Sequence, residues 1–111
     1  MDNYKVVLVD DEVEVIDAIE QRIHWDILGF EVVGSATNGV KALELVEKQQ
    51  PDVVITDIKM PYMDGLELAR RLNKEYQNIH IIIFTGFDEF EYAKEAVHLE
   101  VEEYMLKPIN A

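Results

Sequence analysis

The stretch VVLVDDE, residues 6–12, decides the fold of this 111-residue chain. Four apolar residues run directly into three acidic ones. An apolar run of this kind predicts a strand that is buried on both faces, as in a parallel sheet. Carboxylates crowded at the end of such a strand repel one another and resist desolvation. The stretch therefore predicts a central strand of a parallel sheet, with a functional reason for the acids that follow it.

Strand and helix patterns alternate along the rest of the chain. Strand-like runs occur at residues 5–9, 31–36, 52–57, 79–84 and 102–107. Apolar residues at helical spacing, with turn or capping residues at the ends, predict helices over residues 12–24, 38–50, around 66–72 and around 90–97. This alternation predicts an α/β fold, a doubly wound five-stranded parallel sheet with helices on both faces.

Composition excludes several classes of protein. Asp and Glu outnumber Lys and Arg 23 to 10, giving a formal net charge of -13, and such a surface should repel nucleic acid. The absence of cysteine excludes disulfides, thiolate metal sites and a cysteine nucleophile. The N-terminus reaches an acid too early for a signal peptide, and no apolar run approaches the roughly 20 residues of a membrane helix. We expect a cytoplasmic domain that does not contact a membrane.

Polar residues follow four of the predicted strands. Asp10 and Asp11 follow the first strand, Asp57 the third, Thr85 the fourth and Lys107 the fifth. The carboxyl ends of parallel strands form one edge, where sites of doubly wound sheets lie. Clustered carboxylates predict a Mg²⁺ site, the hydroxyl can donate to a phosphoryl oxygen, and the ammonium adds positive charge. The set is short of a general base, so it is suited to receiving and holding a phosphoryl group.

Four motifs in this order resemble one family over nearly the whole chain. They are the acid pair after the first strand, ITDIKMPYMDG after the third, FTG after the fourth and YMLKP at the fifth. Together they resemble the receiver domain of bacterial two-component response regulators, which implies a flavodoxin-like strand order, 2-1-3-4-5. HWDILGFEVVGSATNG further resembles the branch whose receiver is fused to an AraC-type helix-turn-helix effector.

The resemblance implies roles for the residues at the acidic edge. Asp57 would be the phospho-acceptor. Asp10, Asp11 and Asp57 would hold Mg²⁺, Asp11 directly, with the backbone carbonyl of Lys59 completing the protein ligands. The donor would be a phosphohistidine on a sensor histidine kinase, or a small acyl phosphate.

The resemblance also implies a conformational switch. Lys107 would contact the phosphoryl group, and Thr85 and Tyr104 would form the switch pair. The domain would then be a signalling module and not an enzyme, although it would assist its own phosphorylation and dephosphorylation. DNA would be bound by a C-terminal effector domain outside the chain, not by the receiver.

The last residues of the chain lead to an expectation about its boundary. A receiver of this family continues into a fifth helix after the Lys-Pro turn, and this sequence stops at KPINA. We expect residues 1–111 to be one receiver domain, truncated before that helix. Pairing with a second copy is left open, although the many acids between residues 88 and 103 should oppose it on that face.

Plainer interpretations exist for single residues. Asp10 and Asp11 could be solvated loop acids, Thr85 a helix cap and Tyr104 a fixed core aromatic. Glu12 is better explained as an acid of the first helical turn than as a ligand.

Two other functional classes are alternatives to this interpretation. A magnesium-dependent phosphatase also uses an aspartate nucleophile, but usually has a second acid two residues later, where this chain has Lys59. Multiple turnover of a phosphate ester would favour it. A flavodoxin-like cofactor binder would need a phosphate loop without acids after the first strand, and a yellow protein would favour it.

Overall fold

The computed structural model describes residues 3–85 and 103–106, with side chains described as far as residue 84. Within these residues the chain forms a five-stranded sheet in the order β2-β1-β3-β4-β5, and each neighbouring pair is parallel. The strands are β1 (Tyr4–Val9), β2 (Phe30–Ala36), β3 (Val53–Thr56), β4 (His80–Thr85) and β5 (Glu103–Leu106). The helices are α1 (Val13–Arg22), α2 (Gly39–Gln49) and α3 (Gly65–Glu75). The predicted doubly wound sheet and its strand order are confirmed.

The strand β1 lies inside the sheet between β2 and β3, which explains its apolar sequence. Its last four residues, Val6 to Val9, have exposed fractions of 2% or less. Side chains of a strand alternate between faces, so these residues contribute to both layers of the core. The complete burial expected for VVLV is confirmed.

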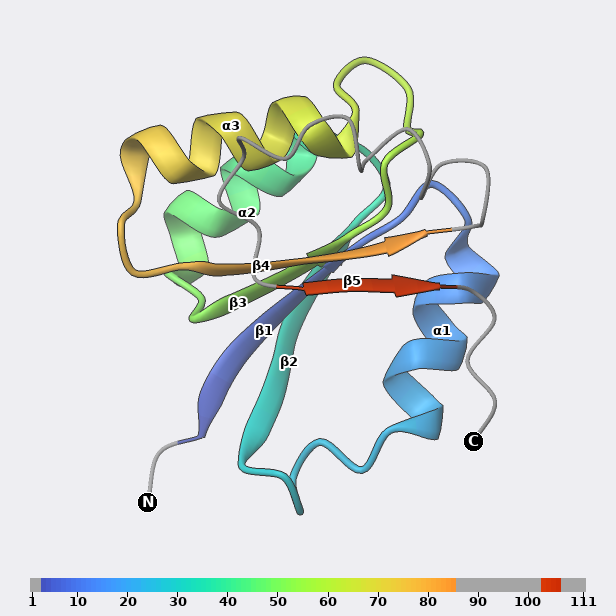
Figure 1. Ribbon diagram of the computed structural model, residues 1–111. Coiled ribbons are helices and arrows are strands. Elements are labelled where there is room, and N and C mark those ends of the chain that lie inside the picture. Colours follow the sequence, from blue (N-terminus) through green and yellow to red (C-terminus); the bar gives the residue numbers. More distant parts are fainter. Residues whose placement is uncertain (1–2, 86–102, 107–111) are drawn as a thin grey trace.

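Helices cover the two faces of the sheet (Figure 1). On one face α2 and α3 pack over a core cluster that includes Val7, Val46 and Leu68. On the other face α1 packs over a second cluster, which includes Leu8, Ile16 and Ile19. This layering leaves the two ends of the strands as the edges at which polar groups can gather.

The edge strand β2 contains a bulge at Val33. The register runs from Val6↔Val32 directly to Val7↔Gly34, so one extra residue lies in β2. A bulge changes which face the following side chains point to. Val33 and Ala36 therefore pack on the same face, with the cluster beneath α2 and α3, although they are three residues apart, whereas Val32 packs with the α1 cluster.

Side chains cap two of the helices at the carboxyl edge. The Asn38 side chain accepts a hydrogen bond from the Lys41 N–H at 2.9 Å, and Asp64 accepts one from the Glu67 N–H at 2.8 Å. Each bond satisfies a backbone donor that a helix N-terminus otherwise leaves open. Asn38 is therefore the capping residue of α2.

Two apolar side chains at the starts of helices are exposed. Val13 and Val40 have exposed fractions of 54% and 44%. They are the first residue of α1 and the second of α2, so both lie at a helix end beside the carboxyl edge of the sheet. The expected helix around residues 90–97, the acidic stretch 88–103 and the boundary before a fifth helix lie outside the described residues, apart from the backbone of β5.

Candidate functional site

The carboxyl ends of β1 and β3 bring Asp10 and Asp57 onto neighbouring strands. Val9 pairs with Thr56 in the sheet, and each is followed directly by its aspartate. The Asp57 N–H donates to the Val9 carbonyl at 2.9 Å, which extends the ladder by one further bond. Pairing of β1 with β3 therefore places the two acids side by side in register.

Both aspartates are buried. Asp10 is 2% exposed and Asp57 is 7% exposed. A buried carboxylate costs free energy unless hydrogen bonds or a cation compensate it. The Asp10 Oδ1 accepts the Glu12 N–H at 2.9 Å, and the Asp57 Oδ1 accepts the Ile58 N–H at 2.7 Å. Backbone donors therefore hold each acid at the edge.

Three consecutive acids form a compact group at the end of β1. Asp10, Asp11 and Glu12 each offer a carboxylate oxygen, and these oxygens lie within 4.8 Å of one another. Asp11 and Glu12 are exposed, whereas Asp10 is buried. Among the described side chains this all-oxygen group is the candidate cation site, and Asp57 is not one of its members.

Glu12 has a different position from the one expected. It is the N-cap of α1, and its side chain makes no capping hydrogen bond. Its carboxylate lies with those of Asp10 and Asp11 instead. The sequence carried one signal for this, since Glu12 directly follows the acid pair.

The backbone around Asp57 is fixed by Gly65. The Gly65 N–H donates to the Ile58 carbonyl at 2.6 Å, and a Cβ at residue 65 would overlap the Asp57 carbonyl oxygen. The Thr56 hydroxyl donates to that same carbonyl at 2.9 Å. The start of α3 is therefore packed directly against the backbone of the candidate acceptor.

The loop between β3 and α3 closes over the same edge. Met63 fills the space left by the missing side chain of Gly39, where a Cβ would lie 2.8 Å from the Met63 Cβ. Tyr62 has a φ of 71°, which non-glycine residues seldom adopt. Its side chain is 89% exposed. Lys59, whose carbonyl was predicted as a ligand, has an exposed side chain.

The other predicted site residues are described in part or not at all. The backbone of Thr85 ends β4 and pairs with Leu106 of β5, and Tyr104 pairs with Ile83. The side chains of Thr85 and Tyr104 lie outside the described part of the structure, as does the whole of Lys107. Their convergence on Asp57 stays a prediction.

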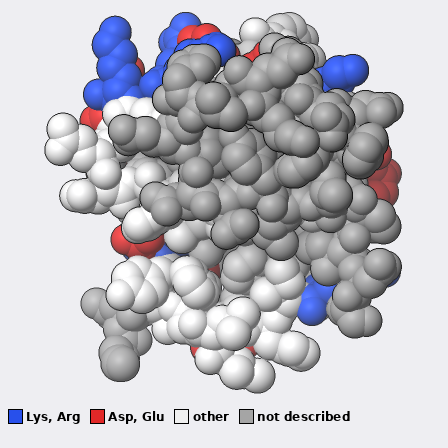
Figure 2. All heavy atoms as spheres, in the orientation of Figure 1, with Lys and Arg blue, Asp and Glu red and all other residues white. Residues whose placement is uncertain are grey.

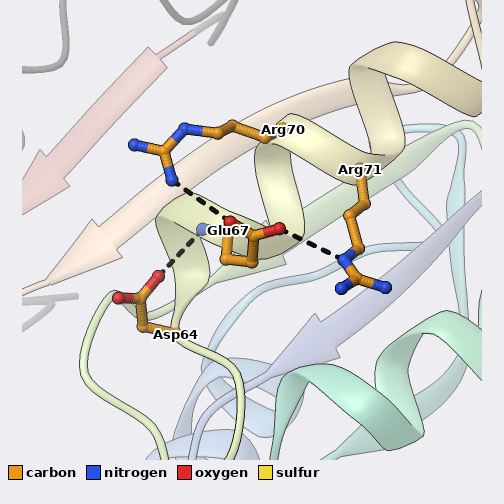
Figure 3. Close-up of polar contacts among 4 residues, drawn as sticks. All are labelled: Asp64, Glu67, Arg70 and Arg71. Carbon is orange, nitrogen blue, oxygen red and sulfur yellow. Dashed lines mark hydrogen bonds and ion pairs between the residues drawn. The ribbon is translucent and has the colours of Figure 1, made fainter.

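A separate charged group lies on the exposed surface of α3. Glu67 accepts hydrogen bonds from the Arg71 Nε at 3.2 Å and from the Arg70 Nη1 at 3.3 Å (Figure 3). The hydrogen bond from Arg71, with a smaller contribution from Arg70, lowers the pKa of Glu67 below its ordinary 4.5. Figure 2 shows basic side chains gathered over this helix. The group is exposed and stabilises the helix surface only weakly.

The fold and the acidic edge agree with the comparisons to known proteins. The sequence model of the family described as the response regulator receiver domain matches residues 6–111. The chain belongs to this family. A receiver domain is the phospho-accepting switch of a response regulator, and the relatives of this chain are transcriptional regulators.

Related proteins narrow the branch of the family. The transcriptional regulatory protein YesN of Bacillus subtilis is 46% identical over 107 residues, which are 96% of this chain and 29% of that protein. HptR of Staphylococcus aureus is 36% identical over 107 residues, again 96% of this chain, and 42% of that protein. This receiver therefore spans less than half the length of these relatives.

Solved structures resemble the receiver closely. The REC domain of AraT, a response regulator from Geobacillus stearothermophilus, has a TM-score of 0.91 and 42% identity, with 96% of this chain and 83% of that chain covered. A two-component transcriptional regulator AraC from Clostridium phytofermentans has a TM-score of 0.88 and 33% identity, with 97% and 84% covered. The predicted likeness to receivers of AraC-type regulators is confirmed. No described helix is both long and apolar enough to cross a membrane.

Proposed function

We propose that Asp57 is the residue that accepts the phosphoryl group. The observation that carries this proposal is the placement of Asp57, a buried carboxylate at the end of β3, beside the buried Asp10 at the end of β1. Its Oδ1 accepts the Ile58 N–H, which fixes the orientation of the carboxylate. Gly65 holds the backbone beneath it. A carboxylate fixed in this way loses little orientational freedom in a transfer reaction.

Asp10, Asp11, Asp57 and the backbone carbonyl of Lys59 are the proposed ligands of Mg²⁺. The donor set fits this ion because all of its atoms are oxygens, and the carboxylates of Asp10 and Asp11 already lie within 4.8 Å of each other and of Glu12. When bound, Mg²⁺ would offset the charge that carboxylates and phosphoryl oxygens bring together. Relief of repulsion among the acids would couple metal binding to stability.

The proposed reaction is a transfer of one phosphoryl group to Asp57. A carboxylate oxygen of Asp57 forms a bond to phosphorus while the P–N bond of a kinase phosphohistidine breaks, and the histidine leaves with the bonding electron pair. With a small acyl phosphate the P–O bond breaks instead and a carboxylate leaves. Lys107 contacts the transferred group, and Thr85 donates a hydrogen bond to one of its oxygens.

Phosphorylation would bias a two-state switch. Thr85 moves toward the new dianion, and Tyr104 rotates into the space that this movement opens. The state of the switch controls a DNA-binding effector in the complete protein, which acts in the cytoplasm. The kinase, the effector and the use of DNA are proposals from the relatives' names as transcriptional regulators and from the acidic receiver, which should not bind DNA itself.

Stoichiometry of labelling tests this proposal. Incubation with a small acyl phosphate and Mg²⁺ should add one phosphoryl group per chain, and chelation of the metal should prevent the gain in mass. Asp57→Asn should not acquire it. Repeated turnover of a phosphate ester would instead indicate a phosphatase, and labelling that persists in Asp57→Asn would remove Asp57 from its role.

A further inference from the structure

The edge of the sheet opposite Asp57 carries an exposed apolar surface. This amino-edge patch consists of Tyr4, Trp25, Ile27, Leu28 and Phe30. Tyr4, Ile27 and Leu28 are 62%, 78% and 61% exposed. The Phe30 ring centroid lies 5.8 Å from that of Tyr4 and 6.4 Å from that of Trp25, so Phe30 packs between the other two rings. Figure 1 shows the connector between α1 and β2 at the lower edge of the view, away from the carboxyl ends of the strands.

The backbone beneath the patch is held in place. The Tyr4 N–H donates to the Gly29 carbonyl at 2.9 Å, and the Phe30 N–H donates to the Trp25 carbonyl at 2.8 Å. Gly29 has a φ of 86°, which lets the chain turn directly into β2. The exposed side chains of the connector are therefore presented by a fixed turn, which lowers the entropy cost of binding through them.

Acidic residues lie beside the part of the patch formed by Trp25 and Phe30. An open hollow of about 560 Å³ is lined by Trp25 and Phe30 together with Glu20, Asp26 and Glu31. These acids are exposed, and no Lys or Arg is among the residues that line the hollow. Uncharged atoms cover much of the lower margin of the face drawn in Figure 2. Aromatic side chains with an acidic rim fit a partner that combines apolar and basic side chains.

The indole of Trp25 supplies a second observation. Its Nε1 is buried and has no hydrogen-bond acceptor among the described residues. A buried donor without an acceptor costs free energy. Trp25 is also the one tryptophan of the chain, so its fluorescence reports on this patch.

We propose that the amino-edge patch is the docking surface for the basic, DNA-binding effector region of the same protein. This rests on the proposed function, which supplies that effector. A region that binds DNA carries Lys and Arg for the phosphate backbone, and these complement the acidic rim. In the relatives the matching segment is 29% and 42% of the protein, so most of their length is available to contribute such a region. Docking here leaves the Asp57 edge open to a phosphoryl donor.

A second copy of the receiver fits this surface less well. Two patches related by a twofold axis would place the acids Glu20, Asp26 and Glu31 of one copy against a surface that carries the same acids, and like charges across an interface oppose association. A tethered effector meets opposite charge at the patch, and its tether gives it a high effective concentration.

Acrylamide quenching of Trp25 in the full-length protein tests the proposal, read as the difference from Trp25→Phe. Ile27→Ser combined with Leu28→Ser should lower the docked-to-open ratio about tenfold and raise the quenching of Trp25. High salt should raise the quenching of Trp25 in the parent protein, because salt screens the attraction between the exposed rim acids and a basic partner. The matched control is Val40→Ser, which removes an exposed apolar side chain at the carboxyl edge and should leave the quenching unchanged.

Three outcomes would overturn the docking proposal. The first is equal quenching of Trp25 in the parent and in the double variant. The second is quenching of the parent that rises on dilution while its mass falls from dimer to monomer, and the third is a full-length protein without a basic DNA-binding region. Acyl phosphate labelling and the melting temperature are measured on the same samples. Normal labelling with unchanged quenching rejects the docking surface alone, whereas absent labelling of the parent protein rejects the proposed function.

Discussion

The two edges of the sheet use the same strands for opposite purposes. At the carboxyl edge Asp10 and Asp57 are buried, and backbone N–H groups hold their carboxylates. At the amino edge Tyr4, Ile27 and Leu28 are exposed on a hydrogen-bonded turn. The first edge buries groups that prefer water, and the second exposes groups that avoid it. Both arrangements cost stability, and the two proposals assign a binding partner to each edge.

The largest expected effect comes from a single methyl group at the carboxyl edge. Gly65→Ala would place a Cβ against the Asp57 carbonyl, and the start of α3 would have to shift. Overpacking of this kind should lower the free energy of unfolding by about 3 kcal/mol and reduce the phosphorylation of Asp57. Chemical denaturation and phosphoryl labelling measure the two effects.

The amino edge supplies the control for this variant. Gly29→Ala adds a methyl group with no atom within 4 Å, at a φ of 86°. Its cost should be about 1 kcal/mol, from backbone conformation alone, with labelling unchanged. If Gly29→Ala reduced stability and labelling as much as Gly65→Ala, the start of α3 would not be what positions Asp57.

Neutralising one acid should stabilise the protein without metal. Asp10→Asn removes a buried charge from the group within 4.8 Å, and an amide oxygen can still accept the Glu12 N–H. In chelator the melting temperature should rise, which corresponds to about 1 kcal/mol of added stability. The increase in melting temperature on adding Mg²⁺ should become smaller.

Asp52 at the amino end of β3 is the matched residue. Its Oδ2 accepts the Lys5 N–H at 2.7 Å, and it belongs to no candidate metal group among the described residues. Asp52→Asn should therefore not stabilise the protein in chelator. A fall in stability for Asp10→Asn would show that hydrogen bonding, and not repulsion, governs that position.

Loss of the α2 cap should have a moderate effect at the carboxyl edge. Asn38→Ala leaves the Lys41 N–H without its acceptor, and the unfolding free energy should fall by about 1 kcal/mol. Asn38→Asp keeps the acceptor and should retain most of the stability in thermal denaturation. If both variants lose the same amount, packing at residue 38 outweighs the cap.

The smallest expected effect is the pH dependence due to Glu67. Its pKa is lowered in the folded protein by Arg71 and then Arg70, so its contribution is present above pH 4.5 and is lost as the pH falls through the folded pKa. Because Glu67 is exposed on α3, Glu67→Gln should change stability slightly at neutral pH and not at all in acid. Denaturation curves at several pH values check this, and a difference that persists in acid would contradict it.

Much of the fold and of the acidic edge could be predicted from the sequence. The runs VVLV and VVIT lie in buried strands, and the acids after them fall on one edge because parallel strands share their direction. The bulge at Val33 could not be predicted, since Val32 and Val33 are both apolar and either can pack on either face of the sheet. The positive φ of Tyr62 gave no signal, because tyrosine is not a residue that favours it.

The exposure of Val13 and the amino-edge patch also escaped prediction. Val13 lies at helical spacing from the buried Ile16, but spacing does not tell where a helix begins relative to the edge of a sheet. Trp25 lies in the connector and packs on Phe30. That Ile27 and Leu28 remain exposed beside it depends on the three-dimensional path of the turn.

Locating the phosphoryl group by tandem mass spectrometry tests the central claim most directly. The chain is treated with a small acyl phosphate and Mg²⁺, and the fragment that spans β3 is compared with those of Asp57→Asn and Asp52→Asn. The account predicts one phosphoryl group on Asp57, retained in Asp52→Asn and absent from Asp57→Asn. A phosphoryl group on another residue of the parent protein, or no gain in mass with metal present, would contradict it.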